Sequence, residues 1–138
     1  MVKCVSSMLI ILALAGCATT QQSLYDELGG KQTIAAIVDN FITEIQYDAE
    51  ILPYFEGSDI ARFRDKLEEQ LCDVADGPCD YTGDTMAQVH AGMAITEHDF
   101  NLTVDLLINA MTQAGVPHRV QNKLLARLAP MRKDMLYK

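Results

Sequence analysis

One histidine in the second half of the chain lies where a metal ligand could be placed. His90 follows Met86 and Val89 and precedes Ile95, within residues 88–96. A histidine among apolar residues is either a hydrogen-bonded core side chain or a ligand. His90 has no partner histidine at i+4 and no nearby pair of carboxylates, so the pattern does not support a zinc or di-iron site. Ligation by this one histidine remains open.

A haem would need only one such histidine, together with a flat apolar slot and polar groups for its propionates. The side chains that could wall a slot are apolar and aromatic: Phe55, Phe63, Leu67, Met86 and Phe100. Lys66, Tyr81 and Thr82 could meet the propionates. Spacing alone makes this arrangement possible, but on spacing alone a hydrogen-bonded core side chain is the favoured interpretation of His90.

The elements that position these residues are predicted to be helices. Apolar residues recur at steps of three and four, without strand alternation or an internal repeat, which predicts an all-α domain of about five substantial helices. Thr96 and Asp99 form a capping-box pattern, and Pro117 is expected at the first position of the last helix, where Pro130 would bend it. The helices are expected over residues 23–28, 31–45, 59–74, 85–91, 96–114 and 117–131, with a turn at 52–55 and a loop at 77–84.

The N-terminus has the pattern of a bacterial lipoprotein signal. A short positive start and an apolar run too short to span a membrane precede Leu14, Ala15, Gly16 and Cys17, which resemble a lipobox. A plain signal peptide with an incidental cysteine is the alternative. We therefore expect a cleaved signal over residues 1–16, a tether over 17–22 that is lipidated at Cys17, and one domain over 23–138.

Charge excludes some partners. Removing residues 1–16 takes away only Lys3 among the charged residues, so the net charge changes from −8 to about −9. An acidic chain lacks the basic surface that nucleic acid requires, and it lacks a polybasic segment for membranes. Membrane contact is therefore expected to come from the lipid alone.

Two cysteines remain in the expected domain. Cys72 and Cys79 flank the end of one helix and the turn after it, and an exported protein permits a disulfide between them. A redox or zinc role is the alternative, but the spacing is not CxxC and no second ligand pair is visible. We favour the disulfide.

Several segments together resemble the first group of the truncated haemoglobins. The resemblance covers residues 23 to about 135, with spacings that match without gaps. The segments that carry it are 24–30 (LYDELGG), 38–41 (VDNF), 53–57 (PYFEG), 77–83 (GPCDYTG), 86–96 (MAQVHAGMAIT), Phe100 and 114–117 (AGVP).

The resemblance implies a two-over-two helical globin fold that binds haem b. His90 matches the proximal iron ligand, Phe55 matches a phenylalanine that packs on the haem face, and Lys66 matches a common propionate contact. The remaining cofactor contacts are implied on the distal side by Phe63 and Leu67 and on the proximal side by Met86, Val89, Ile95 and Phe100.

The distal side departs from the family. Its usual tyrosine follows the phenylalanine matched by Phe41 and is Ile42 here, and its frequent glutamine is Leu67. Gln70, one turn further along, is either a replacement donor or a surface residue. Asp76-Gly77 also stands where a Gly-Gly pair is usual, which puts the geometry of that turn in question.

These features favour reversible binding of a diatomic gas, namely dioxygen, nitric oxide or carbon monoxide, in a protein tethered in the bacterial envelope. By analogy with lipoprotein sorting, Ala18 suggests the outer membrane facing the periplasm. Oxidation of nitric oxide by a dioxygenase-type reaction with a redox partner, and haem delivery by a globin-fold interaction protein, are the alternatives.

Overall fold

The structure is a computed structural model that describes residues 22–138, so the expected signal segment and Cys17 lie outside the described residues. Helices and connecting turns, without a strand, make up this part of the chain. The all-α prediction is therefore confirmed. The elements are α1 (Leu24–Leu28), α2 (Gly30–Tyr47), the 3-10 helix η1 (Leu52–Phe55), α3 (Ile60–Val74), α4 (Met86–Val89), α5 (Glu97–Gln113), α6 (His118–Leu128) and the 3-10 helix η2 (Ala129–Asp134).

Side chains and glycines set the helix boundaries. Ser23 caps α1 by accepting a hydrogen bond from the Asp26 N–H at 3.1 Å. Gly29 has a φ of 99°, in the left-handed region that a residue without Cβ adopts easily, so the chain ends α1 and enters α2 at this glycine. The predicted capping box of Thr96 and Asp99 begins α5.

The C-terminal helices begin and end at other residues than the sequence predicted, and both differences involve a proline. Pro117 is the N-cap of α6 rather than its first residue, and α6 ends at Leu128 instead of bending through Pro130. Pro130 has no N–H to continue the α-helical hydrogen bonds, so the chain passes into η2.

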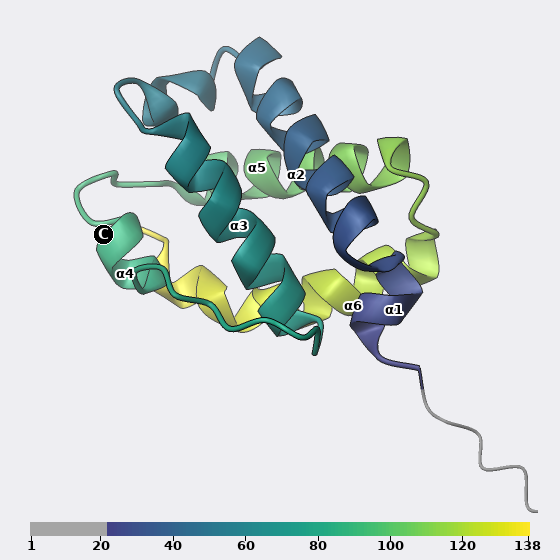
Figure 1. The fold of residues 1–138 in the computed structure, drawn as a ribbon. Helices are drawn as coiled ribbons and strands as arrows, with labels where there is room; N and C mark the ends of the chain where they lie inside the picture. The colour runs from purple at the N-terminus through teal and green to yellow at the C-terminus, as the bar shows by residue number, and fades with distance from the viewer. Residues whose placement is uncertain (1–21) are drawn as a thin grey trace, which may run out of the picture.

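The four long helices form two pairs, α2 with α3 and α5 with α6, and one pair crosses the other (Figure 1). α2 packs against both α3 and α5, and α6 packs against α1, α3 and α5. Figure 1 shows α2 and α3 in front of α5, with α6 along the lower edge and α4 at one side. This is the two-over-two arrangement that the sequence predicted.

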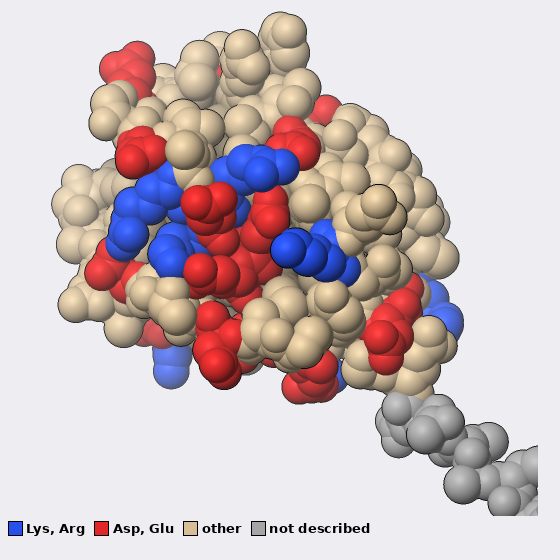
Figure 2. All heavy atoms as spheres, in the orientation of Figure 1, with Lys and Arg blue, Asp and Glu red and all other residues tan. Residues whose placement is uncertain are grey.

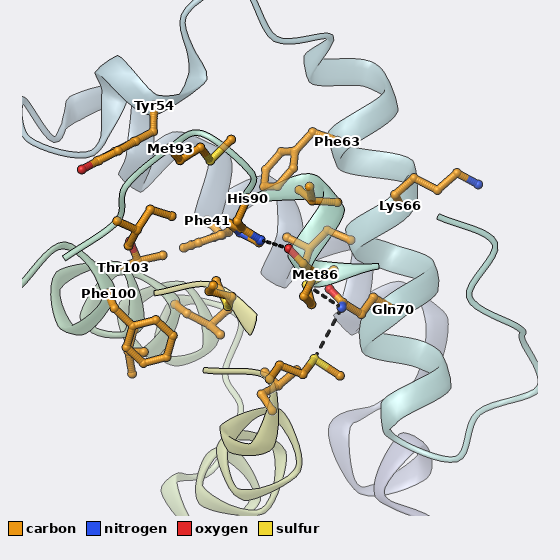
Figure 3. Close-up of a pocket in the computed structure, with 18 of the residues that line it drawn as sticks. Phe41, Tyr54, Phe63, Lys66, Gln70, Met86, His90, Met93, Phe100 and Thr103 are labelled. Atoms are coloured by element: carbon orange, nitrogen blue, oxygen red, sulfur yellow. Dashed lines mark hydrogen bonds between the residues drawn. The ribbon is translucent and has the colours of Figure 1, made fainter. Parts of the chain in front are cut away.

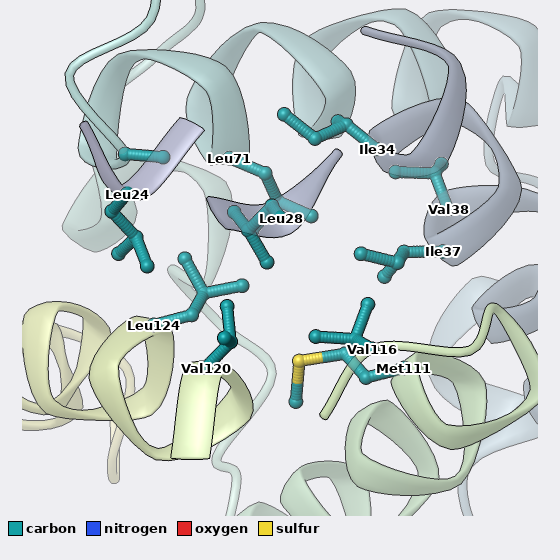
Figure 4. Packing of buried hydrophobic residues seen from close by; sticks show 11 residues of the cluster. Leu24, Leu28, Ile34, Ile37, Val38, Leu71, Met111, Val116, Val120 and Leu124 are labelled. Atoms are coloured by element: carbon teal, nitrogen blue, oxygen red, sulfur yellow. The ribbon is translucent and has the colours of Figure 1, made fainter. Parts of the chain in front are cut away.

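Two apolar clusters lie between these layers. The larger cluster joins α1, α2, α3, α5 and α6 (Figure 4); its fully buried members include Ile37, Leu71, Met111 and Leu124. The smaller cluster contains Phe41, Ile45, Ile51, Leu106 and Ala110. Phe55, Phe63 and Leu67 pack against this second cluster, so it supports the wall on which several predicted site residues lie.

The turn after α3 carries the predicted disulfide. Cys72 and Cys79 are joined, with 6.1 Å between their Cα atoms. Asp76 has a φ of 58°, which aspartate tolerates better than most residues, and Arg127 holds its carboxylate at 2.6 Å. A Cβ at Gly77 would collide with Tyr25 and Cys72. Gly77 therefore stands at the position of the usual Gly-Gly pair where a side chain would not fit. Asp76 stands at the other position and forms an ion pair with Arg127.

Among residues 22–138, no helix combines the length and apolar character that crossing a membrane requires.

Candidate functional site

His90 is placed by a very short helix. Thr85 and Gln88 form a capping box at the start of α4, and His90 is its C-cap. The His90 Nδ1 lies 2.7 Å from the Met86 carbonyl oxygen. Because a carbonyl only accepts, Nδ1 donates in this contact, and in the neutral ring the lone pair then lies on Nε2. His90 is thereby fixed in the tautomer that a metal ligand needs.

His90 opens onto a cavity of about 740 Å³, within the range typical of cofactor pockets. The walls come from α2, η1, α3, α4, α5, α6 and η2 (Figure 3). The structure brings together at this cavity most of the residues that the sequence assigned to it: Phe41, Phe55, Phe63, Lys66, Leu67, Gln70, Tyr81, Met86, Val89, His90, Ile95 and Phe100.

Two assigned residues lie elsewhere. Thr82 is not among the lining residues of the cavity, because its side chain binds Lys66 and Glu69 on the outer side of α3. Ile42 lines a separate pocket of about 180 Å³ between α2, η1 and α3. Phe55 and Phe63 line both pockets, so Ile42 lies behind the cavity wall rather than in it.

On the α3 side of the cavity, the side chains nearest the deep end are Leu67 and Gln70, while Arg62 and Lys66 are the cations that line it from this helix. Leu67 lines it without a donor, and Gln70 is buried with 8% of its surface exposed. The Gln70 amide nitrogen lies 3.3 Å from the Met86 sulfur and 3.6 Å from the Met131 sulfur, both weak acceptors. Gln70 is therefore a cavity residue and not a surface glutamine.

A tyrosine at the rim is already engaged. The Tyr54 hydroxyl donates to Asp99 at 2.8 Å, and this hydrogen bond raises the pKa of Tyr54. The pKa of the Asp99 carboxyl is lowered, chiefly by the hydroxyl and N–H of Thr96 and then by Tyr54. Tyr47, the other tyrosine near the end of α2, is 83% exposed and lies away from the cavity.

The C-terminal segment supplies wall residues that the sequence analysis missed. Met131, Arg132 and Met135 line the cavity from η2 and the residues after it. The guanidinium of Arg132 lies 5.5 Å from the centre of the Phe100 ring and 2.9 Å from Glu97. The one available signal was the spacing of Met131 and Met135, four residues apart on one face.

The same segment is bound to the loop that follows His90. The Ala94 N–H donates to the Lys138 carbonyl and the Tyr137 N–H to the Ile95 carbonyl, each at 3.0 Å. The C-terminus accordingly lies beside α4 (Figure 1). These bonds fix the residues between His90 and α5.

The donor set fits haem better than other metal groups. One histidine with a free lone pair faces a large apolar space, with aromatic rings at its walls and cations at its rim. No group of three or more His, Cys, Asp or Glu suited to a bare metal ion occurs in the described part of the chain. Phe55 and Phe63, with ring centres 5.0 Å apart, form a rigid aromatic corner against which a flat ligand would pack.

Comparison with known proteins agrees with this geometry. A sequence profile of the bacterial-like globins matches residues 23–137. The group 1 truncated hemoglobin GlbN of Mycolicibacterium paratuberculosis is 36% identical over 109 residues, which cover 79% of this chain and 80% of the relative. The protein of the same name from a Nostoc species is 32% identical, covering 84% of this chain and 98% of the relative.

Solved structures give the same result. The truncated hemoglobin of Tetrahymena pyriformis, in its Fe(III) form, superposes with a TM-score of 0.81 at 27% identity, covering 85% of this chain and all of that one. The chain belongs to the bacterial-like globin family, as a truncated haemoglobin of the first group. Its cofactor is haem, and His90 is the histidine that lines the cavity in the described part of the chain.

Proposed function

We propose that this globin reversibly binds a diatomic gas, dioxygen in the first place, at a haem held by His90. The observation that carries the proposal is the His90 Nε2 lone pair, which the Met86 carbonyl fixes at the wall of an apolar cavity. Haem bound there would supply the iron that takes up the gas. The Met86 carbonyl orients the histidine, and apolar side chains line the space beside it.

The apolar wall around Phe41, Phe63 and Leu67 supports simple binding over peroxide chemistry. Cleavage of an O–O bond requires polar groups that stabilise the developing charge. Among the cavity residues, the Tyr54 hydroxyl is committed to Asp99, and the Gln70 amide faces thioether sulfurs. A dioxygenase-type reaction with nitric oxide is the second activity to assay.

The decisive test compares two histidine variants. The reconstituted protein is expected to show a Soret band that shifts on addition of carbon monoxide or dioxygen to the ferrous form. His90→Ala should lose or shift this band, whereas His118→Ala, at an exposed position on α6 outside the cavity, should keep it. An unchanged spectrum in His90→Ala would reject His90 as the ligand.

We also propose that the globin is a lipoprotein of the bacterial envelope, anchored through Cys17. The support is the lipobox-like sequence Leu14 to Cys17, together with a disulfide that suits an oxidising compartment. Labelling of cells with a radioactive fatty acid should mark the protein, and Cys17→Ala should abolish the label. Label retained in Cys17→Ala would contradict the anchor.

A further inference from the structure

The segment between the disulfide and α4 runs back along α3 as a strap, here defined as residues 79–84. Four residues on one face of α3 contact it in reverse order. Arg62 meets Asp84, Lys66 and Glu69 meet Thr82, and Cys72 is bonded to Cys79. The intervals of four, three and three residues place the contact residues of α3 in one row.

The contacts differ in strength along the strap. Arg62 and Asp84 lie 3.0 Å apart, but both side chains are more than half exposed, so water weakens this ion pair. Glu69 is more deeply engaged: its Oε2 accepts from the Thr82 N–H at 3.0 Å and from the Thr82 hydroxyl at 2.8 Å. Lys66 donates to Glu69 at 2.8 Å and to Thr82 at 2.6 Å. At the other end, the disulfide is covalent.

The strap is also a wall of the haem cavity. Tyr81 and Asp84 line the cavity, and the Tyr81 hydroxyl donates to the Asp84 carbonyl at 2.7 Å. Gly83 permits this fold, because a Cβ at that position would collide with the Tyr81 ring. Figure 3 shows the Lys66 ammonium group directed away from His90, although the residue lines the cavity. Figure 2 shows basic and acidic side chains interleaved on the face where α3 lies.

We propose that the strap is the gate through which haem leaves the cavity, and that Glu69 and the Cys72–Cys79 disulfide are the positioning residues that keep it closed. The side-chain hydrogen bonds, the ion pair and the disulfide that tie the strap to another element all go to α3, whereas the Tyr81–Asp84 hydrogen bond lies within the strap. The inference rests on haem binding at His90.

The first experiment measures haem transfer from the holoprotein to excess apomyoglobin, followed in the Soret region. Cys72→Ser/Cys79→Ser should lose haem about tenfold faster than the wild type, a change of about 1.4 kcal/mol in barrier. A dithiol added to the wild type should give the same acceleration. That reaction delivers two electrons and two protons to the disulfide, yields two thiols and converts the dithiol to its own disulfide. The cysteine variant should not respond to the dithiol.

The second experiment uses two matched carboxylates. Glu69 and Glu27 each accept at 2.7–2.8 Å from a lysine, but Glu27 joins α1 to α6 outside the cavity. Glu69→Gln should accelerate haem loss several-fold, whereas Glu27→Gln should not. Thr82→Val should accelerate haem loss as Glu69→Gln does, because it lacks the hydroxyl. Thr82→Ser keeps the hydroxyl and should lose haem at the wild-type rate.

The outcomes are distinct. If the wild type acquires no Soret band with haem, the proposed function fails and the gate fails with it. If haem binds but its loss is equally fast in the wild type, the cysteine variant and Glu69→Gln, the strap is not the gate. Equal acceleration by Glu69→Gln and Glu27→Gln would assign the effect to overall stability and would also overturn the proposal.

Discussion

At the scale of single residues, the position next to Phe41 decides which side chain reaches the gas. Successive residues of an α-helix point about 100° apart, so Phe41 and Ile42 do not face the same space equally. Phe41 lines the haem cavity, and Ile42 lines the smaller pocket behind Phe55 and Phe63. A side chain that donates a hydrogen bond to the bound gas is therefore better introduced on α3, at Leu67, than at Ile42.

Leu67→Gln is expected to slow dioxygen release by roughly ten- to a hundredfold, since a hydrogen bond to a charged or strongly polarised group is worth about 1.5–3 kcal/mol. Ile42→Tyr should slow it less, because its hydroxyl starts behind the wall. Stopped-flow displacement of dioxygen by carbon monoxide measures both rates. Leu67→Met, of similar size and without a donor, is the control. Equal off-rates in Leu67→Gln and Leu67→Met would contradict the prediction.

Sequence reasoning found most wall residues because helical spacing and family motifs fix which positions face inward. It failed where the sequence allowed a side chain to point either into the cavity or toward a neighbouring helix. Thr82 was expected beside the haem and binds Glu69 instead, and the two sulfur contacts of Gln70 depend on Met131, which η2 brings from the far end of the chain. Such partners are set by tertiary packing and not by local pattern.

At the scale of elements, the short helix α4 depends on its cap. A helix of four residues has almost no internal hydrogen bonds, so the Thr85–Gln88 box supplies much of its order. Because the Met86 carbonyl holds His90, loss of the cap should disturb the ligand as well as the helix.

Thr85→Ala is therefore expected to lower the free energy of unfolding of the holoprotein by about 1 kcal/mol and to speed haem loss. Thr43→Ala serves as the control, since the Thr43 hydroxyl is exposed on α2 and only donates to the Asp39 carbonyl. Denaturant unfolding and haem transfer measure the two effects. Unaltered haem transfer in Thr85→Ala would show that the cap does not position His90.

The Glu69 carboxylate should make the contribution of the strap to stability depend on pH. The hydrogen bond from Lys66, followed by the bonds from Thr82, lowers the pKa of Glu69 from 4.5 to about 2. A depressed carboxyl pKa contributes stability that is fully present above about pH 4.5 and is lost as the pH falls through about 2. The difference in Tm between apo wild type and apo Glu69→Gln should stay constant above pH 4.5 and shrink toward pH 2. A difference that does not change with pH would assign the effect to something other than the carboxylate.

The sequence predicted the helices of this assembly more completely than their contacts. Capping residues, glycines and apolar spacing placed α1, α3 and α5 nearly to the residue. The row of Arg62, Lys66 and Glu69 was present in the sequence as a polar face of α3, which usually indicates solvent. Only the path of the disulfide-bonded loop reveals that the strap covers this face.

At the scale of the whole molecule, the two apolar clusters divide two tasks. The larger cluster holds α1, α2, α3, α5 and α6 together, and the smaller one lies behind the α2 and η1 wall of the haem cavity, although Leu71 of the larger cluster also lines the cavity. α6 contributes to both tasks through adjacent residues. Leu124 is fully buried in the larger cluster, and Leu125, next to it, lines the cavity.

Substitution of Leu124 and of Leu125 should therefore affect the stability of the fold and the retention of haem to different degrees. Leu124→Ala leaves a cavity in the packed core and should lower the free energy of unfolding of the apoprotein by about 2–5 kcal/mol, with the Soret spectrum of the holoprotein unchanged. Leu125→Ala removes part of the cavity wall, so it should cost the apoprotein less and should accelerate haem transfer to apomyoglobin. Denaturant unfolding of both apoproteins and haem transfer from both holoproteins give the comparison. Equal effects of the two substitutions on both measurements would mean that the core and the haem site respond as one unit.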